Sequence, residues 1–90
     1  MLYLVAYDIS NDRRRTKVHK LLRGFGTWTQ YSFFECFLSE KELVMLRRRL
    51  DQILKETEDN VRIYQVCQAC QARVETIGSS PPKEDKVYLL

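Results

Sequence analysis

The sequence predicts an α+β fold, a ferredoxin-like sandwich in which two helices cover one face of an antiparallel sheet. An apolar strand pattern opens the chain, and two amphipathic helix patterns follow it. β-forming segments separate the helix patterns and follow the second one. The order strand, helix, strand pair, helix, strand is that of the ferredoxin-like topology. Because both helices lie on one face, we expect a second copy of the chain, in a homodimer, to cover the other.

Composition is that of one small folded domain. The 90 residues are 44% apolar and 30% charged, which is ordinary for a globular chain. The longest apolar run, residues 1–7, is far shorter than the roughly 18 residues of a membrane helix, and no basic stretch or small-residue cleavage site marks it as a signal peptide. We therefore expect a cytoplasmic protein with no membrane partner. An odd number of cysteines, three, predicts reduced thiols.

The first strand and the first helix are predicted from apolar spacing. Residues 2–9 are rich in β-branched and aromatic side chains and are apolar at both alternating sets of positions, as in a central strand. Ser10 or Asn11 can cap the helix that follows. Four apolar residues have the i, i+3, i+4, i+7 spacing of one buried stripe: Val18, Leu21, Leu22 and Phe25. Gly24 and Gly26 end this helix.

The next segment, residues 27–38, is strongly β-forming but long for one strand. A bulge or a tight reversal must divide it. Because the segment has no Gly, Pro or Asn-Gly, its residues do not locate the break.

The second half of the chain predicts one helix and two strands. Ser39 and Glu42 have the spacing of a capping box. The apolar positions after them predict a helix through about residue 56: Leu43, Leu46, Leu50, Ile53 and Leu54. Residues 61–67 predict a strand, and residues 73–77 predict one more short strand.

The sequence predicts a ferredoxin-like domain over residues 1–78 and a C-terminal tail over 79–90, divided by a Gly-Ser-Ser-Pro-Pro stretch. The tail ends in the apolar residues 87–90, which predict a strand added to a sheet edge. The polar residues 83–86 leave a disordered tail as the alternative.

Asp8 is the most informative position for function. A carboxylate at the end of an apolar strand must be solvated, paired or bound to a cation. One interpretation is a ligand for Mg²⁺, which takes one or two protein carboxylates and completes its shell with water and phosphate. The other is an acceptor for backbone N–H groups where the strand passes into the helix.

A basic segment follows Asp8. Residues 10–26 hold six basic side chains and one acidic one, a net charge of +5. Arg13, Arg14 and Arg15, with Lys17 and Lys20, begin the helix beside Asp8, and guanidinium groups suit phosphate oxygens. The shortage of nearby acids favours phosphate binding over a solvated helix face.

Other residues that can carry chemistry have simpler explanations. Arg47–Arg49 lie among acids, so surface pairing of Asp51 with Arg47 and Lys55 accounts for them. Cys67 and Cys70 have the spacing of half a zinc site, but no second ligand pair completes it. No helix start is predicted there to activate a thiol. His19 is expected on the surface.

Several motifs together resemble a known family: residues 7–12, Tyr-Asp-Ile-Ser-Asn-Asp; residues 13–18, Arg-Arg-Arg-Thr-Lys-Val; Gly26; and residues 30–35, Gln-Tyr-Ser-Phe-Phe-Glu. They resemble the small CRISPR-associated endonucleases of the spacer-acquisition machinery, the Cas-two family. The match in order and spacing covers nearly the full chain. Trp28 stands where the family often has a basic residue.

The resemblance implies a ferredoxin-like homodimer in which the first-strand aspartates of two subunits face each other and hold Mg²⁺. It makes Asp8 the catalytic residue and the metal ligand. Charge and resemblance together predict these nucleic-acid-binding residues: Tyr7, Ser10, Arg14, Arg15, Lys17 and Phe34.

Three functions follow. The first is a magnesium-dependent endonuclease of CRISPR spacer acquisition and antiviral defence, acting on single-stranded RNA or double-stranded DNA. The second is a non-catalytic scaffold that binds nucleic acid and bridges the CRISPR integrase. The third, a ferredoxin-like regulatory module, is disfavoured by the charge of +5 in residues 10–26.

Overall fold

A computed structural model describes residues 1–78, so the predicted added strand in residues 79–90 lies outside the described residues. Seven elements follow one another along the chain: β1 (Leu2–Asp8), α1 (Asp12–Arg23), β2 (Thr27–Gln30), β3 (Phe33–Phe37), α2 (Glu40–Ile53), β4 (Asn60–Val66) and α3 (Gln68–Gln71). The first six have the predicted order. The short helix α3 was not predicted.

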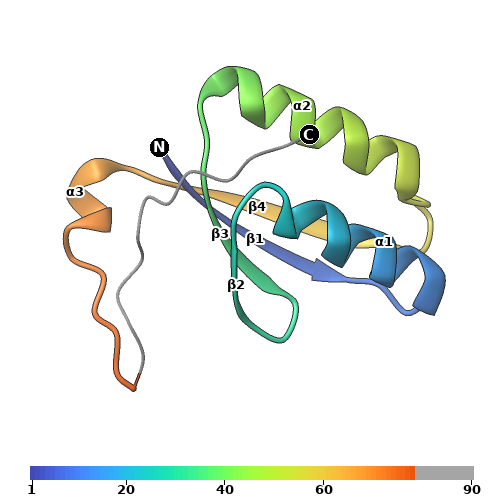
Figure 1. The fold of residues 1–90 in the computed structure, drawn as a ribbon, viewed down its shortest axis with the longest axis horizontal. Helices are drawn as coiled ribbons and strands as arrows, with labels where there is room; N and C mark the ends of the chain where they lie inside the picture. Colours follow the sequence, from blue (N-terminus) through green and yellow to red (C-terminus); the bar gives the residue numbers. More distant parts are fainter. Residues whose placement is uncertain (79–90) are drawn as a thin grey trace.

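The four strands form one antiparallel sheet in the order β2-β3-β1-β4. Val5 of β1 lies between Phe34 of β3 and Ile63 of β4, so β1 is a central strand, as its two apolar faces predict. The helices α1 and α2 lie side by side on one face of this sheet (Figure 1). The predicted ferredoxin-like α+β sandwich is confirmed.

The core lies between this sheet face and the two helices. The buried side chains come from both layers: Tyr3, Val5, Tyr7, Phe34 and Cys36 from the strands, and Val18, Leu22, Leu46 and Leu50 from the helices. Gly26 lets the start of β2 approach β3 closely, because a Cβ at this position would collide with the Cys36 sulfur and the Glu35 carbonyl.

Residues 27–38 are divided by both a bulge and a tight reversal, the two features that the sequence offered as alternatives. The register between β2 and β3 shifts between Trp28 and Gln30, and Tyr31 and Ser32 form the reversal. Tyr31 has a φ of 47°, a backbone region that non-glycine residues seldom occupy. The indole Nε1 of Trp28 donates a hydrogen bond to the Tyr31 carbonyl at 2.7 Å and stabilises the turn. A tyrosine in this role gives no turn signal in the sequence.

The helix starts agree with the sequence, and one helix end differs. Asn11 caps α1 by accepting the Arg14 N–H, and Ser39 and Glu42 form the predicted capping box of α2. Helix α2 ends at Ile53 rather than near residue 56. The N–H of Lys55 donates instead to the Asp59 carboxylate at 2.8 Å, which directs the chain into the loop before β4.

The prediction of a strand over residues 73–77 is wrong. After β4, Cys67 caps the single turn α3, and the N–H groups of Arg73 and Val74 donate back to carbonyls of that turn. The residues after it are exposed and bury no apolar face; Ile77 is 99% exposed. Their β-branched side chains therefore gain no packing in a sheet.

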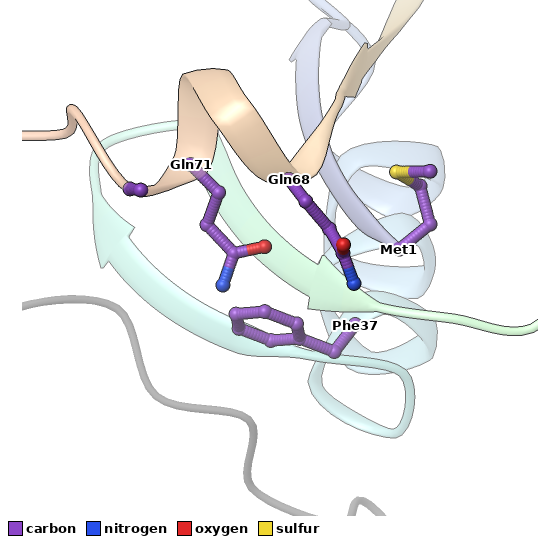
Figure 2. Close-up of a pocket in the computed structure, with 5 residues that line it drawn as sticks. Met1, Phe37, Gln68 and Gln71 are labelled. Atoms are coloured by element: carbon purple, nitrogen blue, oxygen red, sulfur yellow. The ribbon is translucent and has the colours of Figure 1, made fainter.

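The second face of the sheet carries apolar and charged side chains without helix cover. Alternation along β1 places Leu4, Ala6 and Asp8 on this open face, opposite to the core residues. Their cross-strand neighbours include Phe33, Glu35, Arg62 and Tyr64. At one end, α3 turns Gln68 and Gln71 toward Phe37 and borders an open hollow of about 290 Å³ (Figure 2).

Candidate metal and nucleic-acid site at the end of the first strand

Asp8 is the last residue of β1 and lies on the open face with its carboxylate exposed. Asn60 of β4 is directly opposite it, and Arg62 is opposite the preceding Ala6 on the same face. Five residues line a shallow depression of about 200 Å³ here: Ala6, Tyr7, Asp8, Asn60 and Arg62. The site therefore combines a carboxylate, an amide and a guanidinium at one end of the sheet.

The structure does not bear out Asp8 as an acceptor for backbone N–H groups at the start of α1. Asn11, not Asp8, accepts a backbone N–H in the first turn of α1, that of Arg14, at 2.9 Å. Within residues 1–78 the Asp8 carboxylate takes part in no hydrogen bond or ion pair. Its oxygens are thus available to a cation or to solvent.

The donor atoms at this site fit Mg²⁺. The ion prefers hard oxygen ligands, and the Asp8 carboxylate and Asn60 amide both offer them. The described part of the chain contains no group of three or more His, Cys, Asp or Glu side chains able to hold a metal. Within residues 1–78, one chain therefore brings one carboxylate and one amide to this site.

Arg15 fixes the loop that leaves Asp8. Its guanidinium donates to the carbonyls of Ile9 and Ser10 at 3.1 and 3.2 Å and pairs with Asp12. The predicted site residues Ser10 and Arg15 therefore meet beside Asp8. The Ser10 side chain is exposed.

Arg14 is not a free phosphate ligand. Its guanidinium binds Asp59 through Nε at 2.7 Å and Nη2 at 3.2 Å, and it contacts Glu58 at 3.1 Å. The side chain of Asp59 has no exposed surface. The expectation that few acids surround the basic segment is wrong here, because these two acids come from the loop before β4, more than forty residues along the chain.

This ion pair sets the protonation of the loop. The hydrogen bond from Arg14, followed by that from the Lys55 N–H, lowers the pKa of the Asp59 carboxyl. Hydrogen bonds from Lys55 and then Arg14 lower the pKa of Glu58. Because both pKa values are lower in the folded chain, the stabilisation is fully present above the unfolded pKa values and is lost as the pH falls through the folded ones.

Replacing Arg14 with Ala is expected to lower the melting temperature by several degrees at pH 7, because the Asp59 carboxylate loses its charged partner in a site without water access. The difference from wild type should shrink below about pH 4, where both acids become protonated. Thermal unfolding followed by circular dichroism from pH 3 to 7 measures it. Lys17→Ala, at an exposed position of the same helix, is the control. Equal melting temperatures for Arg14→Ala and wild type would contradict this role.

A basic stripe of three residues, Arg13, Lys17 and Lys20, follows the solvent side of α1 at i, i+4 and i+7. All three are exposed, and none belongs to the ion pairs of residues 1–78. This basic stripe can meet phosphate, and so can the exposed Arg23 at the end of α1, which is also in none of these ion pairs. Of the predicted contacts, Lys17 belongs to the basic stripe.

Two of the predicted nucleic-acid contacts lie in the core. Phe34 has no exposed surface, and Tyr7 is 7% exposed. The Tyr7 hydroxyl is 3.0 Å from Nδ1 of His19, and the His19 ring packs edge-on against Phe34. Neither aromatic ring can stack on a base, and His19 is a half-buried packing residue rather than the surface side chain that was expected.

Sequence reasoning missed Asn60 and Arg62. They join Asp8 only through the antiparallel register of β1 and β4, which pairs residues more than fifty positions apart. Alternation along residues 60–66 is the signal that was available, since Asn60 and Arg62 share one parity and the half-buried Val61 and Ile63 the other.

The predicted pairing of Asp51 with Arg47 and Lys55 does not form. Lys55 pairs with Glu58 at 2.7 Å, because the helix ends two residues before Lys55. Arg47, Arg48 and Arg49 are exposed on α2, and in the part of the chain that the structure describes they form no ion pair.

The fold and this site define a small ferredoxin-like protein with a free carboxylate at the end of its first strand and a basic helix directly after it. The profile of the family described as CRISPR associated protein Cas2 matches residues 1–74. The chain belongs to this family, as the motifs of the sequence predict.

Curated relatives cover nearly the whole chain. The CRISPR-associated endoribonuclease Cas2 1 of Chloroflexus aurantiacus is 45% identical over 93 residues, covering 100% of both chains. The CRISPR-associated endonuclease Cas2 2 of Thermus thermophilus is 45% identical over 83 residues, covering 92% of this chain and 88% of the relative. The prediction of a nuclease therefore agrees with the names of these relatives.

Solved structures agree with the fold. The crystal structure of Streptococcus pyogenes Cas2 at pH 6.5 matches with a TM-score of 0.75 and 37% identity, over 87% of this chain and 100% of that one. A chain of a partial Cas6-RT-Cas1--Cas2 complex matches with a TM-score of 0.73 and 28% identity, over 89% and 93% of the two chains.

Proposed function

We propose that this chain is a magnesium-dependent endonuclease of CRISPR spacer acquisition that works as a homodimer. The observation that supports the proposal most directly is the exposed Asp8 carboxylate, which has no protein partner in residues 1–78 and lies beside an amide and a guanidinium. The relatives named as endonuclease and endoribonuclease support the same reaction class. Single-stranded RNA and double-stranded DNA are the two candidate substrates.

Each residue of the site has a proposed role. Asp8 and Asn60 would hold Mg²⁺, which when bound orients a water and stabilises negative charge on the phosphate. Arg62 lies on the same face and is placed to bind a phosphate oxygen of the substrate. Arg15 holds the loop of Ile9 and Ser10, so that the carboxylate keeps its position at the strand end. The Ser10 side chain is exposed and can contact the backbone of the nucleic acid.

A homodimer would complete this site. One subunit supplies a single carboxylate, and the open sheet face exposes apolar and aromatic surface, including Tyr64 at 46%. Burial raises the pKa of Glu35 on the same face, so this carboxyl is already partly withdrawn from solvent in one subunit. A second copy on this face would bring two Asp8 side chains together and cover the apolar surface.

A scaffold that bridges the CRISPR integrase is the second candidate. The basic stripe lies on the helix layer, whereas Asp8 lies on the open face of the sheet, so the chain can bind phosphate without using Asp8. The chain of the partial Cas6-RT-Cas1--Cas2 complex supports an integrase as the partner. In the described residues, no helix has the length and apolar character needed to cross a membrane.

Light scattering of the full chain is expected to give the mass of two subunits at micromolar concentration, because a dimer removes the apolar surface of the open sheet face from solvent. Tyr64→Glu on this face should shift the mass toward one subunit, while Gln52→Glu on the exposed side of α2 should not. A single-subunit mass for wild type would contradict the shared metal site.

The reaction itself is tested by incubating the wild-type chain with labelled single-stranded RNA and, separately, double-stranded DNA, with Mg²⁺ or with a chelator. Cleavage of at least one substrate that requires Mg²⁺ is expected. Binding without cleavage of either would overturn the nuclease and favour the scaffold.

A further inference from the structure

Two exposed thiols face each other at the start of α3. Cys67 is the cap of this turn, and the N–H of Cys70 donates to its sulfur at 3.4 Å. Cβ atoms three residues apart on a helix lie roughly 5–6 Å from each other, little more than the roughly 3.5–4.5 Å of a disulfide. Because side-chain rotation does not move a Cβ atom, closing the disulfide requires the cap and the single turn of α3 to tighten by roughly 1–2 Å.

The pKa values of the two thiols are shifted in opposite directions. The backbone N–H of Cys70, and then its thiol, lowers the pKa of Cys67, whereas Cys67 raises the pKa of Cys70. The expectation that no helix start activates a thiol here is wrong, because α3 follows Cys67 directly. An attacking thiol and a resolving thiol have this asymmetry.

The third cysteine is a matched internal control. Cys36 is fully buried in β3, and burial raises the pKa of its thiol to about 12. It is therefore protonated and closed to reagents in the folded chain. The same molecule thus contains one inert thiol and one accessible pair.

The surroundings leave this pair open to solvent. Gln68 and Gln71 turn their amides toward Phe37 (Figure 2). Cys67 and Cys70 are exposed. In the described residues no other His, Cys, Asp or Glu joins the pair into a group of three that could hold a metal. Thiol chemistry is thus the reaction that this pair supports.

We propose that Cys67 and Cys70 form a reversible intrachain disulfide by exchange with a low-molecular-weight disulfide. The Cys67 thiolate attacks one sulfur of that disulfide and releases the first thiolate. The Cys70 thiolate then attacks the Cys67 sulfur and releases the second thiolate. The two cysteines lose two electrons, which reduce the added disulfide, and their two protons go to the released thiolates.

The test exposes the reduced full-length chain to oxidised glutathione at neutral pH without oxygen, followed by acid quenching, alkylation and mass spectrometry. Wild type is expected to lose two hydrogens and to give one peptide linked between Cys67 and Cys70, and dithiothreitol should reverse the change. Cys36 should be alkylated only after denaturation. A disulfide between two chains, or a mixed disulfide that never closes, would overturn the proposal.

Two variants separate the roles of the thiols. Cys70→Ser should stop at a stable mixed disulfide on Cys67, because the resolving thiol is absent. Cys67→Ser should react more slowly than Cys70→Ser, since the backbone N–H of Cys70 lowers the pKa of Cys67 and Cys70 has no such donor. Equal rates for the two variants, with circular dichroism spectra like that of wild type, would overturn the assignment of Cys67 as the attacking thiol.

Discussion

Replacing Asp8 with Asn is expected to reduce magnesium-dependent cleavage by at least roughly a hundredfold, since a metal ligand contributes several kcal/mol of transition-state stabilisation. The amide keeps the volume of the side chain but loses the negative charge that attracts the cation. Asp8 is exposed and makes no ion pair in residues 1–78, so the fold should not change. The measurement is the initial rate of cleavage over a series of Mg²⁺ concentrations.

The matched control is Asp51→Asn, which removes the same charge from an exposed position of α2, far along the chain from the site. It should cleave as wild type does. Binding of the nucleic acid by Asp8→Asn should stay within about twofold of wild type, because the basic stripe remains. A rate for Asp8→Asn equal to wild type at saturating Mg²⁺ would remove Asp8 from the reaction.

The fold was predictable because its elements follow local rules. The buried stripe of α1 and the capping box of α2 depend on residues within a few positions of each other. The capping box is confirmed, and of the stripe Val18 and Leu22 are buried in α1, Leu21 is half-buried, and Phe25 is buried just after the helix ends. The break in residues 27–38 was not predictable, because Tyr31 adopts a left-handed conformation without Gly or Asn. The turn α3 is too short to show a helical period, so its cap at Cys67 was also missed.

The candidate site was predictable only in part, for a related reason. Asp8 stands out locally as an acid that ends an apolar strand. Its neighbours Asn60 and Arg62 depend on strand register, and the partners of Arg14 come from a loop more than forty residues away. Burial of Phe34 follows from packing of the whole core. Features that depend on neighbouring residues were therefore predicted correctly, whereas features that depend on contacts between distant parts of the chain were missed or had to be corrected.

Replacing all three residues of the basic stripe, Arg13, Lys17 and Lys20, with Ala is expected to weaken binding of every nucleic-acid sequence alike. Each phosphate contact releases counterions, so the slope of log affinity against log salt should fall by about 2–3 on double-stranded DNA. Arg14 and Arg15 stay in place, because they hold the Asp59 loop and the loop after Asp8. Fluorescence anisotropy in the Asp8→Asn background measures binding without cleavage.

The matched control removes the same charge from the other helix: Arg47→Ala, Arg48→Ala and Arg49→Ala in α2, where all three side chains are exposed and unpaired within the described residues. If phosphate lies along α1, the control should change the salt slope by less than about one. Equal slopes for the two triple variants would mean that net charge, rather than the basic stripe, determines binding. An unchanged slope for the α1 variant would place the nucleic acid on another surface. Unequal losses on unrelated sequences would show that the stripe reads bases, which phosphate contacts cannot do.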